Sequence, residues 1–193
     1  MNPLDVRRDL DALRALFGAI DTLLDLDPAV LSAVAPSVSG WSPEQHVAHV
    51  ALANELVLRN LKSLAKGSGM LVVKGGEAHP RALELLAAGR LPRGEAEAPR
   101  MVRPPEKVER ELLLQWLADG KRELASIDAA QLVASDMKIP HQILGPLDAP
   151  QWARFGAVHA RHHLVIVLEV LRSIGVEKLP DLASLEAHTS SHR

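Results

Sequence analysis

The chain has 193 residues, of which 47% are hydrophobic, 24% are charged and none is cysteine, and its formal net charge is -2. This composition predicts one folded domain with a large aliphatic core, and it excludes an intrinsically disordered class, disulfides, cysteine-ligated metals and cysteine nucleophiles. The 22 basic and 24 acidic residues form no long run of either sign, so neither nucleic acid nor a membrane surface is favoured as a partner.

The first residues of the chain alternate charged with apolar side chains, which is unlike a signal peptide or a membrane span. We therefore expect a cytoplasmic protein. The same stretch begins an amphipathic pattern that predicts a first helix over about residues 4–26. Its apolar stripe comprises Val6, Leu10, Leu13, Phe17, Ile20 and Leu24.

A short helical piece over residues 28–34 follows, and a turn at residues 36–40 ends it. The second long helix is expected over about residues 43–66. Ser42 can cap this helix, Pro43 suits the first helical position, and Gln45 can complete a capping box.

Residues 67–105 are rich in Gly, Pro and Arg, and only residues 80–88 have a helical pattern, with Gly89 placed to end it. Such a long irregular crossover indicates a lid over a site or a dimer contact. A plain connection between two parallel helices explains it equally well.

A third helix is predicted over about residues 105–126, with a short continuation near residues 128–133. A loop containing Pro140 and Gly145 follows. The fourth helix, over about residues 149–174, has a capping box in Asp148 and Gln151 and a stop at Gly175.

These elements predict an all-α fold, an antiparallel four-helix bundle with a long irregular crossover between helices two and three and without strands. We expect the bundle domain to span residues 1–176 and a polar, partly disordered tail to span residues 177–193. Sites in bundles are built from inward-facing side chains on neighbouring helices.

Three histidines are predicted to face the interior. Because each helical residue advances about 100 degrees, His159 and His163 lie in the middle of the apolar stripe of the fourth helix, where rings at i and i+4 can converge on one cation. His49 faces inward on the second helix. An aliphatic core has no reason to accept several imidazoles together unless a cation satisfies their nitrogens jointly, although hydrogen-bonded core histidines are the alternative.

Other polar side chains near this group have simpler interpretations. His46 is placed to stack on Trp41 at the helix start, and His162 falls at the edge of the apolar stripe. Three helical carboxylates are best interpreted as surface charges, so that the general base stays unidentified. These are Glu44, Glu55 and Glu169.

Two motifs contain these histidines. The first is W-S-P-E-Q-H-V-A-H at residues 41–49, and the second is P-H-Q-I-L-G-P-L at residues 140–147, followed by Trp152 and by H-A-R-H-H at residues 159–163. In both, and in the order of its elements, the chain resembles the DinB-like superfamily, the damage-inducible and thiol-transferase-like bundle proteins. His141-Gln142 departs from the His-Pro frequent in similar proteins, which leaves the loop geometry and a role for His141 open.

The resemblance implies a three-histidine site for zinc, nickel or a similar divalent ion at His49, His159 and His163, commonly in a homodimer. Three neutral imidazoles leave the ion its charge and an open position, so a metal-water centre of the catalytic type is expected. The first hypothesis is a metal-dependent hydrolase, or a thiol-dependent transferase or isomerase that acts on a small molecule with a low-molecular-weight thiol. The alternatives are a non-catalytic, metal-stabilised bundle with a stress-response or ligand-binding role, and a helical protein without metal.

Overall fold

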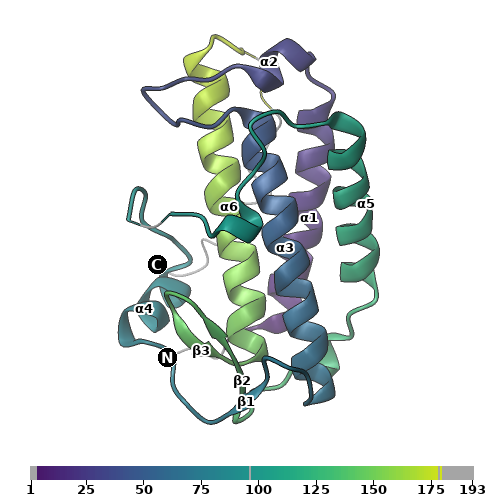
Figure 1. Cartoon of the computed structure of the whole chain (residues 1–193), viewed down its shortest axis with the longest axis vertical. Coiled ribbons are helices and arrows are strands. Elements are labelled where there is room, and N and C mark those ends of the chain that lie inside the picture. The colour runs from purple at the N-terminus through teal and green to yellow at the C-terminus, as the bar shows by residue number, and fades with distance from the viewer. Residues whose placement is uncertain (1–3, 96, 178, 180–193) are drawn as a thin grey trace.

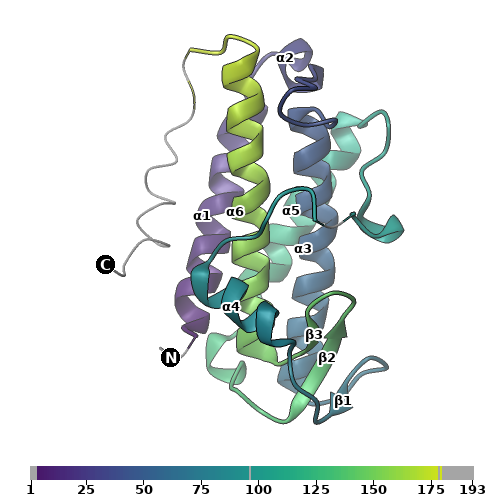
Figure 2. The same cartoon turned by 90° about the vertical axis from the view of Figure 1, so that its left-hand side faces the viewer.

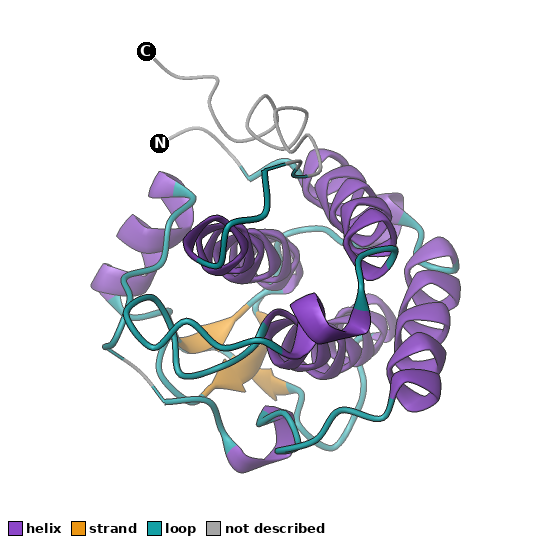
Figure 3. Ribbon diagram, turned by 90° about the horizontal axis from the view of Figure 1, so that it is seen from above, coloured by secondary structure: helices purple, strands orange, loops and turns teal. Residues whose placement is uncertain are grey.

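Four long helices lie side by side along the molecule in a computed structural model that describes residues 4–95, 97–177 and 179 (Figure 1). They are α1 (Val6–Leu24), α3 (Pro43–Lys66), α5 (Arg110–Ala125) and α6 (Ala149–Ser173). Helix α6 contacts both α1 and α3, and α5 contacts the same two helices. Seen end-on, the four helices therefore enclose a common interior (Figure 3).

The directions of the helices follow from the short elements at their ends. Helix α1 leads through α2 (Pro28–Ser32) into α3, which returns along the molecule. Helices α3 and α5 both run toward the end that holds a small sheet, whereas α6 begins there (Figures 1 and 2). Helix α6 is thus antiparallel to α3, and the crossover links two parallel helices.

The sheet corrects the prediction that the fold has no strands. It consists of β1 (Val73–Lys74), β2 (Met137–His141) and β3 (Gly145–Leu147), in that order and antiparallel. Val73 lies opposite Lys138, and Pro140 lies opposite Pro146. These segments are short, contain Pro and Gly, and lack alternation, so the sequence carries no strand pattern there. The structure is mostly helical with one small sheet.

Both predicted capping boxes are present. The Ser42 hydroxyl accepts a hydrogen bond from the Gln45 N–H at 3.3 Å, and the Gln45 side chain accepts one from the Ser42 N–H at 3.0 Å. At the start of α6, the Asp148 carboxylate accepts from the Gln151 N–H at 3.0 Å, and the reciprocal bond is 2.9 Å. These bonds satisfy N–H groups that a helix start leaves free, and they fix where the two histidine-bearing helices begin.

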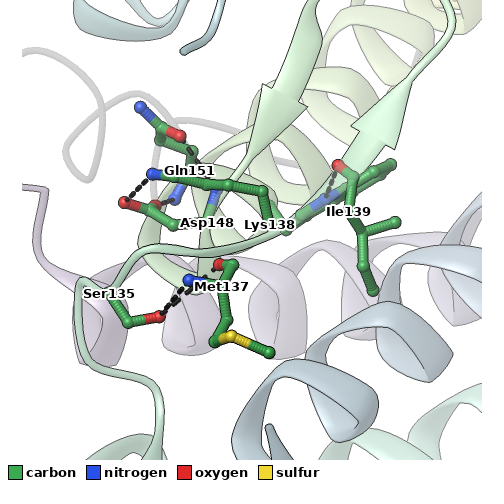
Figure 4. A network of polar contacts seen from close by, with 7 residues as sticks. Ser135, Met137, Lys138, Ile139, Asp148 and Gln151 are labelled. Atoms are coloured by element: carbon green, nitrogen blue, oxygen red, sulfur yellow. Dashed lines mark hydrogen bonds and ion pairs between the residues drawn. The ribbon is translucent and has the colours of Figure 1, made fainter. Parts of the chain in front are cut away.

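The sheet also holds the start of α6. Lys138 of β2 places its ammonium 3.2 Å from the Asp148 carboxylate (Figure 4). The Trp152 indole N–H donates to the Ile139 carbonyl at 3.1 Å, and both residues are buried. The first turn of α6 is therefore fixed two turns before His159.

The crossover is partly ordered into helix. Its α4 (Pro80–Ala88) ends at Gly89, as predicted, with a left-handed backbone at Gly89 that favours glycine. A single 3₁₀ turn, η1 (Arg100–Val102), follows, and another, η2 (Ala129–Gln131), comes after α5. Helix α5 begins at Arg110, five residues later than expected from the sequence.

The late start of α5 has a tertiary cause. Gln45 of α3 donates to the carbonyls of Pro105 and Glu106, both at 3.2 Å, which holds that stretch outside the helix.

The predicted stripe of α1 forms part of the core: Leu10, Leu13, Phe17, Ile20 and Leu24 are all buried. Among the described residues, none of the helices has both the length and the apolar character needed to cross a membrane. The predicted disorder of the tail falls on residues almost all of which, 178 and 180–193, lie outside the described part of the chain.

Candidate metal centre

The histidines of α3 and α6 face each other across the interior of the fold. Because the two helices are antiparallel, a residue one turn earlier on α3 lies beside a residue one turn later on α6. His49 accordingly lies beside His159, with 3.1 Å between their Nε2 atoms, and His46 lies beside His163, with 3.0 Å between their Nδ1 atoms.

One ring nitrogen from each of His49, His159 and His163 lies within 4.8 Å of the other two. A tetrahedral ion with Zn–N bonds of about 2.0–2.1 Å holds its ligand nitrogens about 3.3 Å apart. The 3.1 Å separation between His49 and His159 is close to that value. The three histidines form a group that could hold a divalent metal ion.

The proton on His49 is fixed by the crossover. Its Nδ1–H donates to the Val102 carbonyl at 2.8 Å, which leaves the Nε2 lone pair directed toward His159. Metal-ligating histidines usually donate their other ring N–H to a carbonyl or carboxylate in this way. Val102 was not predicted, because a backbone carbonyl on a distant loop leaves no pattern in the sequence.

Burial is the main cause that lowers the pKa of His49, His159 and His163 below the ordinary histidine value. It also lowers the pKa of His46 to about 4. All four rings are therefore uncharged near neutral pH, and neutral imidazole is the form that binds a metal.

Aromatic side chains surround the group. The Trp41 ring centroid lies 5.2 Å from that of His49 and 6.3 Å from that of His163, and the Phe155 centroid lies 5.3 Å from that of His159. His49 is 3% exposed, whereas His159 and His163 are only partly buried. The group is thus flanked by aromatic rings, and its two α6 histidines are not fully enclosed.

The predicted contact of His46 with Trp41 is present, with a centroid distance of 5.4 Å and an edge-to-face geometry. Stacking is only part of its environment, however. The Nδ1 atom of His46 contacts His163, and its Nε2 atom lies 2.9 Å from the Ser39 hydroxyl. The sequence interpretation, in which His46 only stacks on Trp41, was therefore incomplete.

Two further histidines lie near the group without belonging to it. The Nδ1 atom of His141 accepts from the N–H groups of Ile143 and Leu144, both at 3.2 Å, so that this nitrogen serves the β2–β3 turn. Burial lowers the pKa of His141 to about 4. His162 contacts the His163 ring edge-to-face at 5.1 Å.

The helical carboxylates do not reach the three histidines. Glu55 pairs with Arg59 at 2.5 Å, and Glu169 is bound by both terminal nitrogens of Arg93 at 2.6 and 2.9 Å. Glu44 is half-buried, and burial raises its pKa. Within the described ranges of the chain, no carboxylate joins the three-histidine group, so no general base is assigned.

Comparison with known protein families gives a match over most of the chain. The family model described as the DinB superfamily matches residues 7–167, which include all three histidines and both motifs. Searches of curated proteins and of solved structures found no match.

Proposed function

This chain belongs to the DinB superfamily, and from that premise we propose that His49, His159 and His163 bind one divalent ion, zinc or nickel, and that the protein is a metal-dependent enzyme for a small-molecule substrate. The observation that carries the proposal is the convergence of the three ring nitrogens within 4.8 Å. A rival function is a bundle in which the ion only secures α3 against α6.

The donor set supports the choice of ion and of an open site. Imidazole suits zinc and nickel, and three protein ligands leave a coordination position for water or substrate, as in catalytic rather than structural sites. When bound, such an ion lowers the pKa of a coordinated water or thiol, or polarises a carbonyl.

Residues around the three histidines orient and pack against their rings. The Val102 carbonyl orients His49, and the Trp41 ring packs against the same histidine. The Phe155 ring packs against His159. The partial exposure of His159 and His163 supports access by a small molecule. We propose two reaction classes, hydrolysis and thiol-dependent transfer or isomerisation with a low-molecular-weight thiol as second substrate, which are those that the resemblance to DinB-like proteins implies.

A cytoplasmic homodimer extends the proposal. The family resemblance supports the homodimer, and so do exposed apolar side chains at the sheet end, where Met70 is 100% exposed, Leu71 61% and Ile143 48%. Light scattering on the purified chain tests the dimer. We expect the mass of a dimer for the parent and a larger share of monomer for Leu71→Ser. A monomeric parent would contradict it.

Elemental analysis of protein purified without an affinity tag tests the metal site. We expect one ion per chain in the parent and none in His49→Ala and His163→Ala. The matched control is His79→Ala, because His79 is an exposed histidine whose ring bonds to the Ile143 carbonyl and lies outside the group. Equal metal content in all four proteins would remove the site.

Activity separates the enzyme from its rival. Chelated and zinc-reloaded protein would be compared on activated esters, and on electrophiles offered together with a thiol. Turnover that returns with zinc supports the proposed enzyme. An ion that raises the melting temperature without turnover on either panel would favour the non-catalytic, metal-stabilised bundle.

A further inference from the structure

His46 is a buried histidine whose two ring nitrogens both have partners. It is 3% exposed, its Nδ1 lies 3.0 Å from the Nδ1 of His163, and its Nε2 lies 2.9 Å from the Ser39 hydroxyl oxygen. Two nitrogens at that distance must share one proton, because two facing lone pairs or two facing N–H groups would repel. One of the two rings therefore carries its proton on Nδ1 and donates it, and the Nδ1 atom of the other ring accepts.

Metal binding would fix which of the two rings donates. With its Nδ1 facing His46, His163 has its Nε2 left for an ion, and a neutral ring that coordinates through Nε2 carries its proton on Nδ1. His163 then donates to His46, whose own proton must lie on Nε2 and is donated to the Ser39 oxygen.

Ser39 is suited to end this chain of hydrogen bonds. Its oxygen also accepts from the Trp41 backbone N–H at 3.0 Å, so that a hydroxyl with two lone pairs receives two donors. The chain of bonds runs from the proposed ligand to the turn that precedes α3.

We propose that His46 and Ser39 are positioning residues that fix the ring orientation and tautomer of His163 for a divalent cation, an inference that rests on the proposed function. The role matches that of the Val102 carbonyl for His49, with an imidazole in place of a carbonyl as acceptor. In the described part of the chain, the Nδ1 atom of His159 is buried without a hydrogen-bond partner, so packing against Phe155 must orient that ring.

Substitutions at His46 separate hydrogen bonding from packing. In His46→Asn the amide oxygen replaces Nδ1 as acceptor, whereas His46→Leu keeps an apolar side chain and loses the acceptor. Removing the group that hydrogen-bonds to the second ring nitrogen of a ligating histidine typically lowers metal affinity by about 10–100-fold. We expect His46→Leu to raise the zinc dissociation constant by about that factor, measured by competition with a chromophoric chelator, and His46→Asn to restore most of the affinity.

His162→Leu is the matched control, because the His162 ring also packs on the His163 ring, with 5.1 Å between the ring centroids. This contact is edge-to-face packing, whereas His46 faces the Nδ1 atom of His163. It should bind zinc as the parent does. If His46→Leu loses its helical circular dichroism, Ser39→Ala serves instead, with a smaller decrease in affinity because only the end of the chain of bonds is removed.

A spectroscopic measurement tests the tautomers directly. Long-range ¹H–¹⁵N correlation spectra of zinc-loaded protein should show His163 protonated on Nδ1 and His46 protonated on Nε2. His46 protonated on Nδ1, or unchanged zinc affinity in His46→Leu, would overturn the proposed role of His46 and Ser39 while leaving the metal site intact. A parent that binds no zinc would overturn both the proposed function and the proposed role of His46 and Ser39.

Discussion

Gly156 of α6 lies where that helix packs on α3, one turn before His159. A Cβ added there would lie 2.9 Å from Val57 Cγ1 and 3.5 Å from Leu13 Cδ1. Non-bonded carbons prefer separations of about 3.5–4.0 Å, so the methyl group of Gly156→Ala would be at least about 0.6 Å too close to Val57. The two helices would have to separate next to the candidate site.

Two contributions of opposite sign determine how Gly156→Ala changes the free energy of unfolding. Overpacking a well-packed core costs about 1–3 kcal/mol, whereas alanine in place of glycine inside a helix gains about 1 kcal/mol. The control is Gly18→Ala in α1, where nothing lies within 4 Å of the added atom. Gly18→Ala should therefore be stabilised by about 1 kcal/mol, and Gly156→Ala should be about 1–3 kcal/mol less stable than this control.

Urea unfolding of both variants measures this difference, provided that their m-values agree. Zinc affinity should fall in Gly156→Ala and stay unchanged in Gly18→Ala. The clash should also disappear when Gly156→Ala is made in a Val57→Ala background, because the offending methyl group is then gone. Equal stability of the two glycine variants would refute the reasoning.

Four further outcomes are expected. Burial raises the pKa of Asp9 to about 7 from 3.8, so the folded chain keeps a proton there that the unfolded chain loses, and the Asp9 contribution to the free energy of unfolding should fall as pH rises from about 4 to 7. The buried histidines, whose pKa values are lowered, contribute in the opposite direction over this range. Urea unfolding across that range should show stability rising more steeply with pH in Asp9→Asn than in the parent, because the histidines are common to both proteins. Asp148→Ala removes the α6 cap and should cost about 1 kcal/mol in thermal unfolding. A chelator should lower the melting temperature of the zinc-loaded parent but not of His163→Ala, because ligand at 100 times its dissociation constant stabilises by about 2.7 kcal/mol. Arg93→Ala should speed hydrogen exchange in residues 90–103 with little change in global stability, since its exposed pair with Glu169 is worth about 0–1 kcal/mol.

Elements defined by local chemistry were predictable from the sequence. Helix α3 has the bounds expected from Ser42 and Gly67, and α4 those expected from Pro80 and Gly89, because caps and breakers act within a few residues. The start of α5 was placed too early, since its true position depends on Gln45, which is about 60 residues away in sequence.

The sheet could not be predicted from local pattern. Its pairing brings Val73 and Lys74 against Lys138 and Met137, and neither segment alone has enough alternation to indicate a strand. Long-range pairing of short segments is decided by the packing of the helices that carry them.

The candidate site was predictable in part. Helical periodicity places His159 and His163 on one face, and the antiparallel course of α6 against α3 brings His49 to them. The partners of the outer ring nitrogens could not be found in this way. The Val102 carbonyl and the Ser39 hydroxyl lie outside both helices, and their positions depend on the course of the loops.

The loops of the fold affect the candidate site although they contribute none of its three histidines. The rings come from rigid helices, but two of them are oriented by loops: His49 by the crossover through Val102, and His163, through His46, by the turn at Ser39. A movement of the crossover would also move the acceptor of the His49 proton. Changes in the crossover can therefore alter metal binding without replacing any of the three histidines.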